Sequence, residues 1–187
     1  GKKSLFIHGP FLVAEVENKN HRVYKANTMQ KEVDRYTKEC IEKNRAFGEL
    51  GHPDTPNINL DRVSHMITEL HRDGNHWIGK AKILDTPMGN IARNLIEGGA
   101  QLGVSSRGLG TLKMVNGVNV VQDDFKLATA ADIVADPSAP GAFVQGIREG
   151  KEFWYDVAKG TWVEEDVEKF YETVRPVSYT HLTLPTI

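Results

Sequence analysis

The chain has 187 residues with a net charge of −2, and a chain of this length can bury roughly 70% of the surface that its unfolded form exposes. The near-neutral charge, without a basic stripe, argues against a dedicated nucleic-acid binder. The single cysteine, Cys40, excludes an internal disulfide, and no apolar run reaches the length that a membrane span needs.

The first fifty residues predict three strands and one helix. Gly9-Pro10 separates the first two strands, and Asn27 or Thr28 can cap the helix. The third strand ends shortly before His52. In chain order, the expected elements are strands at residues 5–8 and 11–16, a helix at 29–44 and a short strand at 46–50.

The next sixty residues predict a hairpin, a second helix and another strand. Asp73-Gly74-Asn75 forms the turn of the hairpin. Thr86 caps the helix, which starts at Pro87 and ends at Gly98-Gly99. The expected strands are at residues 63–71, 76–84 and 102–110.

The remaining chain predicts a second hairpin, one more strand and a final helix. Asn116-Gly117 is the strongest hairpin turn in the sequence. The expected elements are strands at residues 112–115, 118–121 and 125–134 and an amphipathic helix at 163–174. Many strands with hairpin turns and two or three helices favour an α+β domain built on an antiparallel sheet or barrel.

The segment Gly103–Gly110 carries two serines, and either could act as a nucleophile. Alternate residues of a strand share a face. Ser105 therefore shares a face with Arg107, while Ser106 shares one with Val104. Because an arginine is rarely buried without a partner, we expect the Arg107 face to be the open one. This favours Ser105 as the nucleophile and Ser106 as an inward, hydrogen-bonded hydroxyl.

A serine nucleophile needs a base, and the base needs a group that orients it. His52 is the best candidate for the base, because a glycine and a proline hold it in a stiff loop. Asp132, an acid inside an apolar strand, needs a buried partner and is the expected orienting group. Glu49 and Asp54, which lie near His52 in the sequence, remain alternatives.

Arg107 could stabilise the oxyanion that forms during acyl transfer, together with backbone N–H groups and with Ser106 nearby. A surface salt bridge is the alternative for Arg107. No cofactor-binding or complete metal-binding motif is present in the sequence. His71 and His76 flank a turn and could face one another, but a third and fourth metal ligand are missing at a suitable spacing.

The motif Gly48–Pro53 followed by Gly103–Gly110 resembles the prohead core proteases of T-even-type tailed bacteriophages, distant relatives of the herpesvirus maturation protease. Further similar segments occur in the same order at residues 14–16, 18–24, 79–82, 125–127 and 136–140. The resemblance implies a small antiparallel β-barrel or strongly bent sheet wrapped by helices. It places the family histidine on His52 and the family serine on Ser105. Asp132 replaces the histidine that the herpesvirus relatives use as the third member.

The resemblance also implies a serine endopeptidase that works inside the assembling prohead, in the host cytoplasm. Its substrates would be the phage scaffold and core proteins and the major capsid protein, and it could act as a homo-oligomer. The family cleaves after glutamate in Leu/Ile-x-Glu contexts. Ile147-Arg148-Glu149-Gly150 fits that pattern, so we expect a self-cleavage site between Glu149 and Gly150.

These considerations divide the chain into a protease core domain at residues 1–145 and a C-terminal extension with a helix at 146–176. Residues 177–187 resemble translated adaptor sequence from the ends of assembled sequencing fragments, so we expect a non-native tail there. Two other functions stay open. One is a catalytically silent scaffold component of the capsid, and the other is a metal-dependent hydrolase that uses His71, His76 and an acid.

Overall fold

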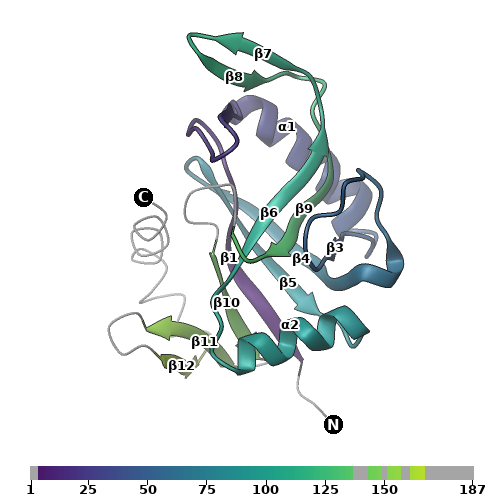
Figure 1. Ribbon diagram of the computed structural model, residues 1–187, viewed down its shortest axis with the longest axis vertical. Coiled ribbons are helices and arrows are strands. Elements are labelled where there is room, and N and C mark those ends of the chain that lie inside the picture. Colours follow the sequence, from purple (N-terminus) through teal and green to yellow (C-terminus); the bar gives the residue numbers. More distant parts are fainter. Residues whose placement is uncertain (1–3, 137–142, 149–150, 157–160, 167–187) are drawn as a thin grey trace.

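The computed structural model describes residues 4–136, 143–148, 151–156 and 161–166. A nine-stranded sheet forms the body, in the order β12-β11-β10-β1-β5-β4-β3, with β6 joined to both β10 and β9 (Figure 1). Its strands are β1 (Leu5–Val13), β3 (Phe47–Glu49), β4 (Val63–Asp73), β5 (His76–Ile83), β6 (Leu102–Leu109), β9 (Lys126–Val134), β10 (Phe143–Arg148), β11 (Lys151–Asp156) and β12 (Thr161–Asp166).

A small second sheet and two α-helices complete the described fold. The second sheet has the order β2-β8-β7 and stands at one end of the body (Figure 1). The strands of the second sheet are β2 (Arg22–Val23), β7 (Leu112–Val115) and β8 (Val118–Val121). The α-helices are α1 (Ala26–Tyr36) and α2 (Pro87–Glu97). Two shorter helical segments are the π-helical turn η1 (Thr37–Ile41) and the 3-10 turn η2 (Leu60–Arg62).

Local turn and cap signals predicted several elements correctly. Strands β4 and β5 and strands β7 and β8 form the two expected hairpins. Helix α2 starts at Pro87, and the Thr86 hydroxyl accepts a hydrogen bond from the Gly89 N–H at 3.0 Å. The α+β class is therefore confirmed. The two hairpins and helix α2 lie as predicted, because a turn or a cap in the sequence marks each of them.

The break in the first strand, the start of the first helix and the final helix were predicted wrongly. β1 runs through Gly9-Pro10 without a break, because a register shift against β5 absorbs the proline. Helix α1 begins at Ala26 after Lys25, and the Thr28 hydroxyl bonds to Asp123 instead of capping. Residues 161–166 form β12 by pairing with β11, so the expected final helix does not begin at residue 163. Residues 167–174 lie outside the described residues.

The described strands do not form a closed barrel. The isolated bridge between Leu50 and Ile133 brings β9 beside the end of β3, but these two strands are not themselves paired. The barrel expectation is therefore not confirmed. Even so, this bridge places the chain just before His52 against β9, which is the arrangement that builds the site.

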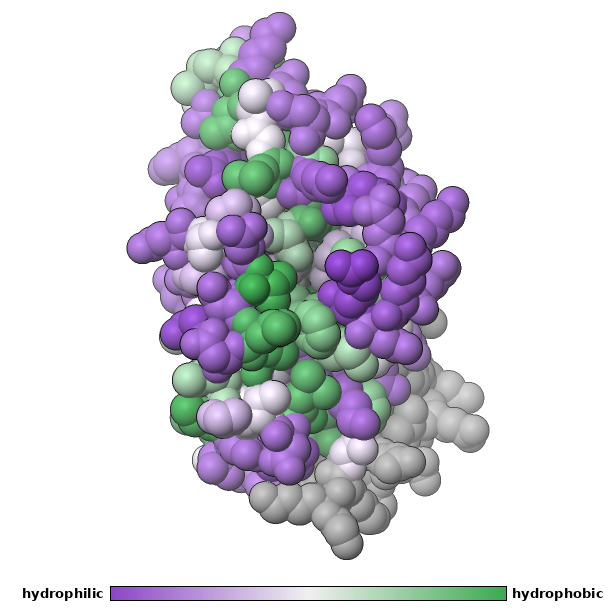
Figure 2. Space-filling view, turned by 90° about the vertical axis from the view of Figure 1, so that its right-hand side faces the viewer, coloured by the Kyte–Doolittle hydropathy of each residue, from purple (hydrophilic) through white to green (hydrophobic). Residues whose placement is uncertain are grey.

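The core lies between the main sheet and the two helices. It contains Phe11, Tyr36 and Trp77, each fully buried. By contrast, Leu112 and Met114 on the projecting β7–β8 hairpin are exposed. Figure 2 shows hydrophobic residues reaching this end of the molecule among polar ones. No helix in the described part of the chain is long and apolar enough to cross a membrane.

Gly48 is the point of closest approach between β3 and the strands that flank it. A Cβ atom at this position would overlap both the His65 ring and the backbone oxygen of Ala131. His65 is fully buried, and its Nε2–H donates to the Ala131 oxygen at 2.7 Å. The absence of a side chain at residue 48 therefore lets β3 pack against β9.

Gly48→Ala should lower the free energy of unfolding by about 1–3 kcal/mol, because a backbone oxygen cannot move aside as a flexible side chain can. Urea denaturation would measure the loss. Gly74→Asn is the matched control, since residue 74 has open space around it and asparagine tolerates its φ of +64°. Equal losses in the two variants would contradict the packing role of Gly48.

Candidate active site

Antiparallel pairing between β6 and β9 places Ser105 directly opposite Asp132. Residues opposite one another in such a pair point to the same face, with Cβ atoms about 4.5–5.5 Å apart. The Ser105 residue is 3% exposed and Asp132 is fully buried. The sheet therefore holds a hydroxyl and a carboxylate side by side, at a depth that little water reaches.

The loop after β3 carries His52 to the same place. The Gly51 N–H donates to the Ile133 oxygen at 2.7 Å, which ties the loop to β9 beside Asp132. Gly51 has a φ of +82°, a conformation that side-chain-bearing residues rarely adopt. Pro53 restricts the backbone on the other side of His52. The stiffness expected from the sequence thus comes with a specific anchor on β9.

The Asp132 carboxylate accepts hydrogen bonds at both oxygens. Its Oδ2 accepts from His52 Nδ1 and from Arg107 Nε, both at 2.8 Å. Its Oδ1 accepts from the Glu49 backbone N–H at 3.0 Å and from Arg107 Nη2 at 3.3 Å. Burial raises the pKa of Asp132, but the bonds from His52 and Arg107 outweigh it and leave the pKa below its ordinary value.

An ionised carboxylate can only accept hydrogen bonds, so His52 Nδ1 carries the proton in this pair. The other ring nitrogen, Nε2, is then the basic one. The His52 side chain is 39% exposed, whereas Asp132 is not exposed at all. The pair therefore has a buried orienting end and a basic end in contact with the outside.

We expected Arg107 on an open strand face, but its side chain is largely buried. Its side chain is only 9% exposed. Its five N–H groups meet five acceptors, which are both Asp132 oxygens, Glu49 Oε2 and the backbone oxygens of Thr55 and Asn57. All of these donors are thus engaged within the protein, and Arg107 holds the acids and the loop in place. The expected part of Arg107 at an oxyanion stays a prediction.

Arg107 does not follow the expected alternation of strand faces, because β6 and β9 do not stay in register. Register shifts occur on both sides of Arg107, so strict alternation ends after Ser105. As a result Ser105, Ser106 and Arg107 all line one pocket. Ser106 is half-buried rather than inward, and its hydroxyl bonds to the Tyr24 phenol.

Glu49 is the second buried acid of the site. Its Oε2 accepts from Arg107 Nη2 at 2.7 Å and from the Asn59 N–H at 3.1 Å. Its Oε1 accepts from Asn59 Nδ2 at 3.2 Å and lies 3.4 Å from Arg62 Nε. Glu49 was an alternative partner for His52, but its carboxylate binds these groups, and the His52 Nδ1 partner is Asp132.

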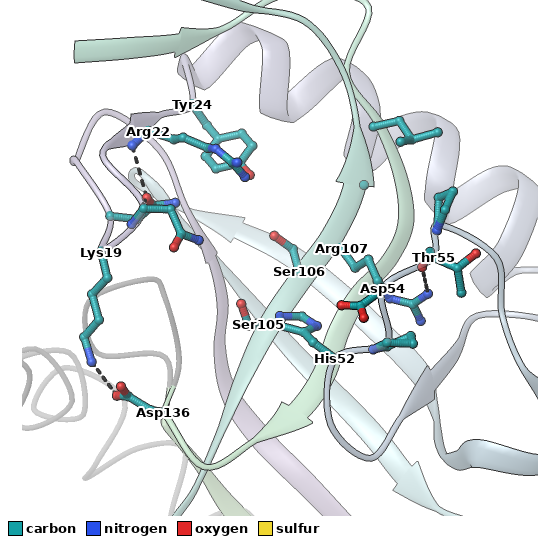
Figure 3. A pocket seen from close by; sticks show the side chains of 16 residues that line it. Lys19, Arg22, Tyr24, His52, Asp54, Thr55, Ser105, Ser106, Arg107 and Asp136 are labelled. Carbon is teal, nitrogen blue, oxygen red and sulfur yellow. Dashed lines mark hydrogen bonds and ion pairs between the residues drawn. The ribbon is translucent and has the colours of Figure 1, made fainter. Parts of the chain in front are cut away.

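The pocket beside these groups has a volume of about 730 Å³. Figure 3 shows the Ser105 side chain next to the His52 ring. Asp54, the other alternative partner, also lines this pocket. The sequence suggested no role for Arg22 and Tyr24, which belong to the wall of this pocket, although residues 18–24 are part of the family resemblance.

The remaining predicted positions do not join this site. In the β4–β5 hairpin, His71 lies opposite Ile78 and His76 opposite Asp73, so the two histidines are not cross-strand partners. The described residues contain no group of three or more metal-ligating side chains. Glu149 and Gly150 lie outside the described residues.

Comparison with known proteins identifies the family of the chain. A family model described as "Prohead core protein serine protease" matches residues 1–152. The chain belongs to this family. The resemblance seen in its motifs is thereby confirmed, and the chain is a protease whose serine type is given by the family description.

Two related proteins support the assignment. The chain is 38% identical to the prohead core protein protease of Enterobacteria phage T4 over 147 residues, which are 76% of this chain and 69% of the relative. Among solved structures, the bacteriophage T4 capsid assembly protease matches with a TM-score of 0.67 and 34% identity, over 71% of this chain and 82% of that one.

Arg107→Met should lower the free energy of unfolding by about 3–5 kcal/mol, because it leaves Glu49 and Asp132 as buried carboxylates that repel one another. Adding Glu49→Gln should recover part of the loss by removing one of the two charges. Urea denaturation of both variants tests this. Arg45→Met, at an exposed arginine outside the site, is the control. If Arg107→Met lowers the free energy of unfolding no more than Arg45→Met does, Arg107 does not have this role.

His65 makes stability depend on pH, because burial lowers its pKa below the ordinary value. Below about pH 6.5 the unfolded chain binds a proton that the folded protein excludes, so the free energy of unfolding should fall as the pH falls. One such group contributes a slope of up to about 1.4 kcal/mol per pH unit. Urea denaturation between pH 7 and pH 5 should show a shallower slope for His65→Gln than for wild type, and an unchanged slope would contradict the expectation.

Proposed function

We propose that this protein is a serine endopeptidase with Ser105 as the nucleophile, His52 as the general base and acid, and Asp132 as the orienting carboxylate. The observation that supports the proposal most is the 2.8 Å bond from His52 Nδ1 to Asp132 in a pocket that Ser105 also lines. A histidine held by a carboxylate beside a serine is the arrangement that can activate the serine, whatever the chain order of the three residues.

In the first step Ser105 Oγ attacks the scissile carbonyl carbon and gives its proton to His52 Nε2. The imidazolium ion then faces the Asp132 carboxylate, which stabilises it. His52 next protonates the leaving amine, and the peptide bond breaks to leave an acyl-serine ester. A water molecule, deprotonated by the same nitrogen, hydrolyses the ester and regenerates Ser105.

Arg107 and Ser106 support this chemistry without touching the reacting atoms. Arg107 is a positioning residue, because it fixes Asp132 and binds the loop oxygens of Thr55 and Asn57. Ser106 bonds to Tyr24 and fixes the pocket wall beside Ser105. Backbone N–H groups are then the oxyanion donors in this proposal.

The substrates follow from the family. We infer that the enzyme digests phage scaffold and core proteins and trims the major capsid protein inside the assembling prohead, within the host cytoplasm. The relatives are a prohead core protein protease and a capsid assembly protease, which supports this setting. Cleavage after glutamate in Leu/Ile-x-Glu contexts, self-cleavage after Glu149 and assembly into a homo-oligomer remain part of the proposal.

Ser105→Ala should fold normally and lose hydrolysis of a Leu-x-Glu peptide by about 10⁶-fold. Asp132→Asn should lose about 10⁴-fold, because the amide favours the wrong histidine tautomer. Progress curves with purified protein would measure both. A serine-directed phosphonate should label wild type and Ser106→Ala but not Ser105→Ala. Labelling of Ser105→Ala would exclude Ser105, and an unlabelled, inactive wild type would favour the silent scaffold component.

A further inference from the structure

The pocket beside Ser105 has two walls of different charge. Residues 18–24 form one wall and the loop from His52 to Pro56 forms the other, with β6 between them (Figure 3). The loop wall carries the acid Asp54, and the opposite wall carries the cations Lys19 and Arg22. A peptide lying in the pocket therefore meets a basic side and an acidic side.

Among the described residues that line this pocket, Arg22 is the lysine or arginine that forms no ion pair. Lys19 forms an ion pair with Asp136 (Figure 3), and Arg107 is bound to Glu49 and Asp132. Among the described residues, no carboxylate pairs with Arg22, and its side chain is exposed. An exposed guanidinium without an ion pair can donate hydrogen bonds to a carboxylate of the substrate, and no ion pair within the protein has to break.

The backbone holds Arg22 in a defined place. Its N–H donates to Asn18 Oδ1 at 3.1 Å, and Asn18 is itself buried. In the second sheet, Arg22 pairs with Asn119 of β8. The side chain therefore extends from a fixed point, which lowers the entropic cost of using it for recognition.

A short chain of contacts links Arg22 to the nucleophile. The positive charge of Arg22 acts on the Tyr24 phenol, which bonds to Ser106, the residue after Ser105. Burial raises the pKa of Tyr24, so its hydroxyl stays protonated and can donate a hydrogen bond. Figure 3 shows Arg22 and Tyr24 on the same wall, with Ser106 and Ser105 beside it.

We propose that Arg22, with the Tyr24 hydroxyl, forms a subsite that selects an acidic side chain close to the scissile bond of the substrate. This inference rests on the proposed peptidase function and assigns its acidic specificity to one wall of the pocket. The guanidinium offers paired N–H donors that match a carboxylate. Asp54 lies on the opposite wall and repels an acidic side chain of the substrate. This repulsion makes that side chain point toward Arg22.

The test compares peptides that carry Glu, Gln or Lys at each position around one scissile bond. Wild type should prefer Glu over Gln at one of these positions, by about tenfold in kcat/KM, as a partly exposed ion pair allows. In Arg22→Ala this ratio should fall to about one, and in Arg22→Glu the Lys peptide should become the better substrate. The wild-type preference should also shrink with added salt, which a purely structural role would not cause.

Arg45→Glu is the matched control, because it makes the same charge change at an exposed arginine outside the pocket. It should keep the wild-type Glu-to-Gln ratio. An unchanged ratio in Arg22→Ala, or a wild type without any acidic preference, would overturn the subsite while leaving the peptidase intact. Cleavage by Ser105→Ala, by contrast, would overturn the proposed function itself.

Discussion

The buried carboxylate of Asp132 is the constraint on which the described site depends. It lies out of contact with water, so its charge must be balanced by donors within the protein. His52, Arg107 and the Glu49 backbone provide them, and each comes from a different segment. Moving any one segment would leave part of this carboxylate unsatisfied, which explains why a loop, a strand end and a bulged strand keep one relative position.

The charges around Asp132 suit an imidazole that gains a proton. Glu49 and Asp132 are two buried negative charges, and Arg107 is the one positive charge buried between them. Arg62 approaches Glu49 but is 41% exposed, so solvent screens it. A protonated His52 adds the positive charge that the cluster lacks. In the proposed mechanism, these fixed charges lie where His52 becomes a cation for a short time, so no charge has to be rearranged during the reaction.

The sequence predicted what depends on neighbours along the chain. Hairpin turns and the Thr86 cap are local, and so were placed correctly. Strand alternation nominated Ser105, the stiff loop nominated His52, and the apolar strand around Asp132 nominated that acid. The exposure of Arg107 was nevertheless predicted wrongly. The rule that arginine avoids burial could not take account of Glu49 and Asp132, which lie 58 and 25 residues away.

The errors in the fold come from strand pairings that the spacing of apolar residues does not report. The helical spacing at residues 163–174 is real, but pairing of β12 with β11 overrides it at residues 161–166. Arg22 and Tyr24 form a pocket wall only because β2 joins β8, almost a hundred residues later. The pairing of β2 with β8 is non-local, and the two residues of β2 are too few to carry a periodic signal.

The distance along the chain between these partners also sets when the site can exist. Glu49 and His52 precede Asp132 by 83 and 80 residues. A chain still on the ribosome therefore carries His52 well before it carries Asp132, the carboxylate that orients this histidine in the proposed triad. Contacts of such long range form late, because closing large loops costs entropy before any contact repays it. An incompletely made chain thus lacks the hydrogen bond between His52 and Asp132 on which the proposed triad depends.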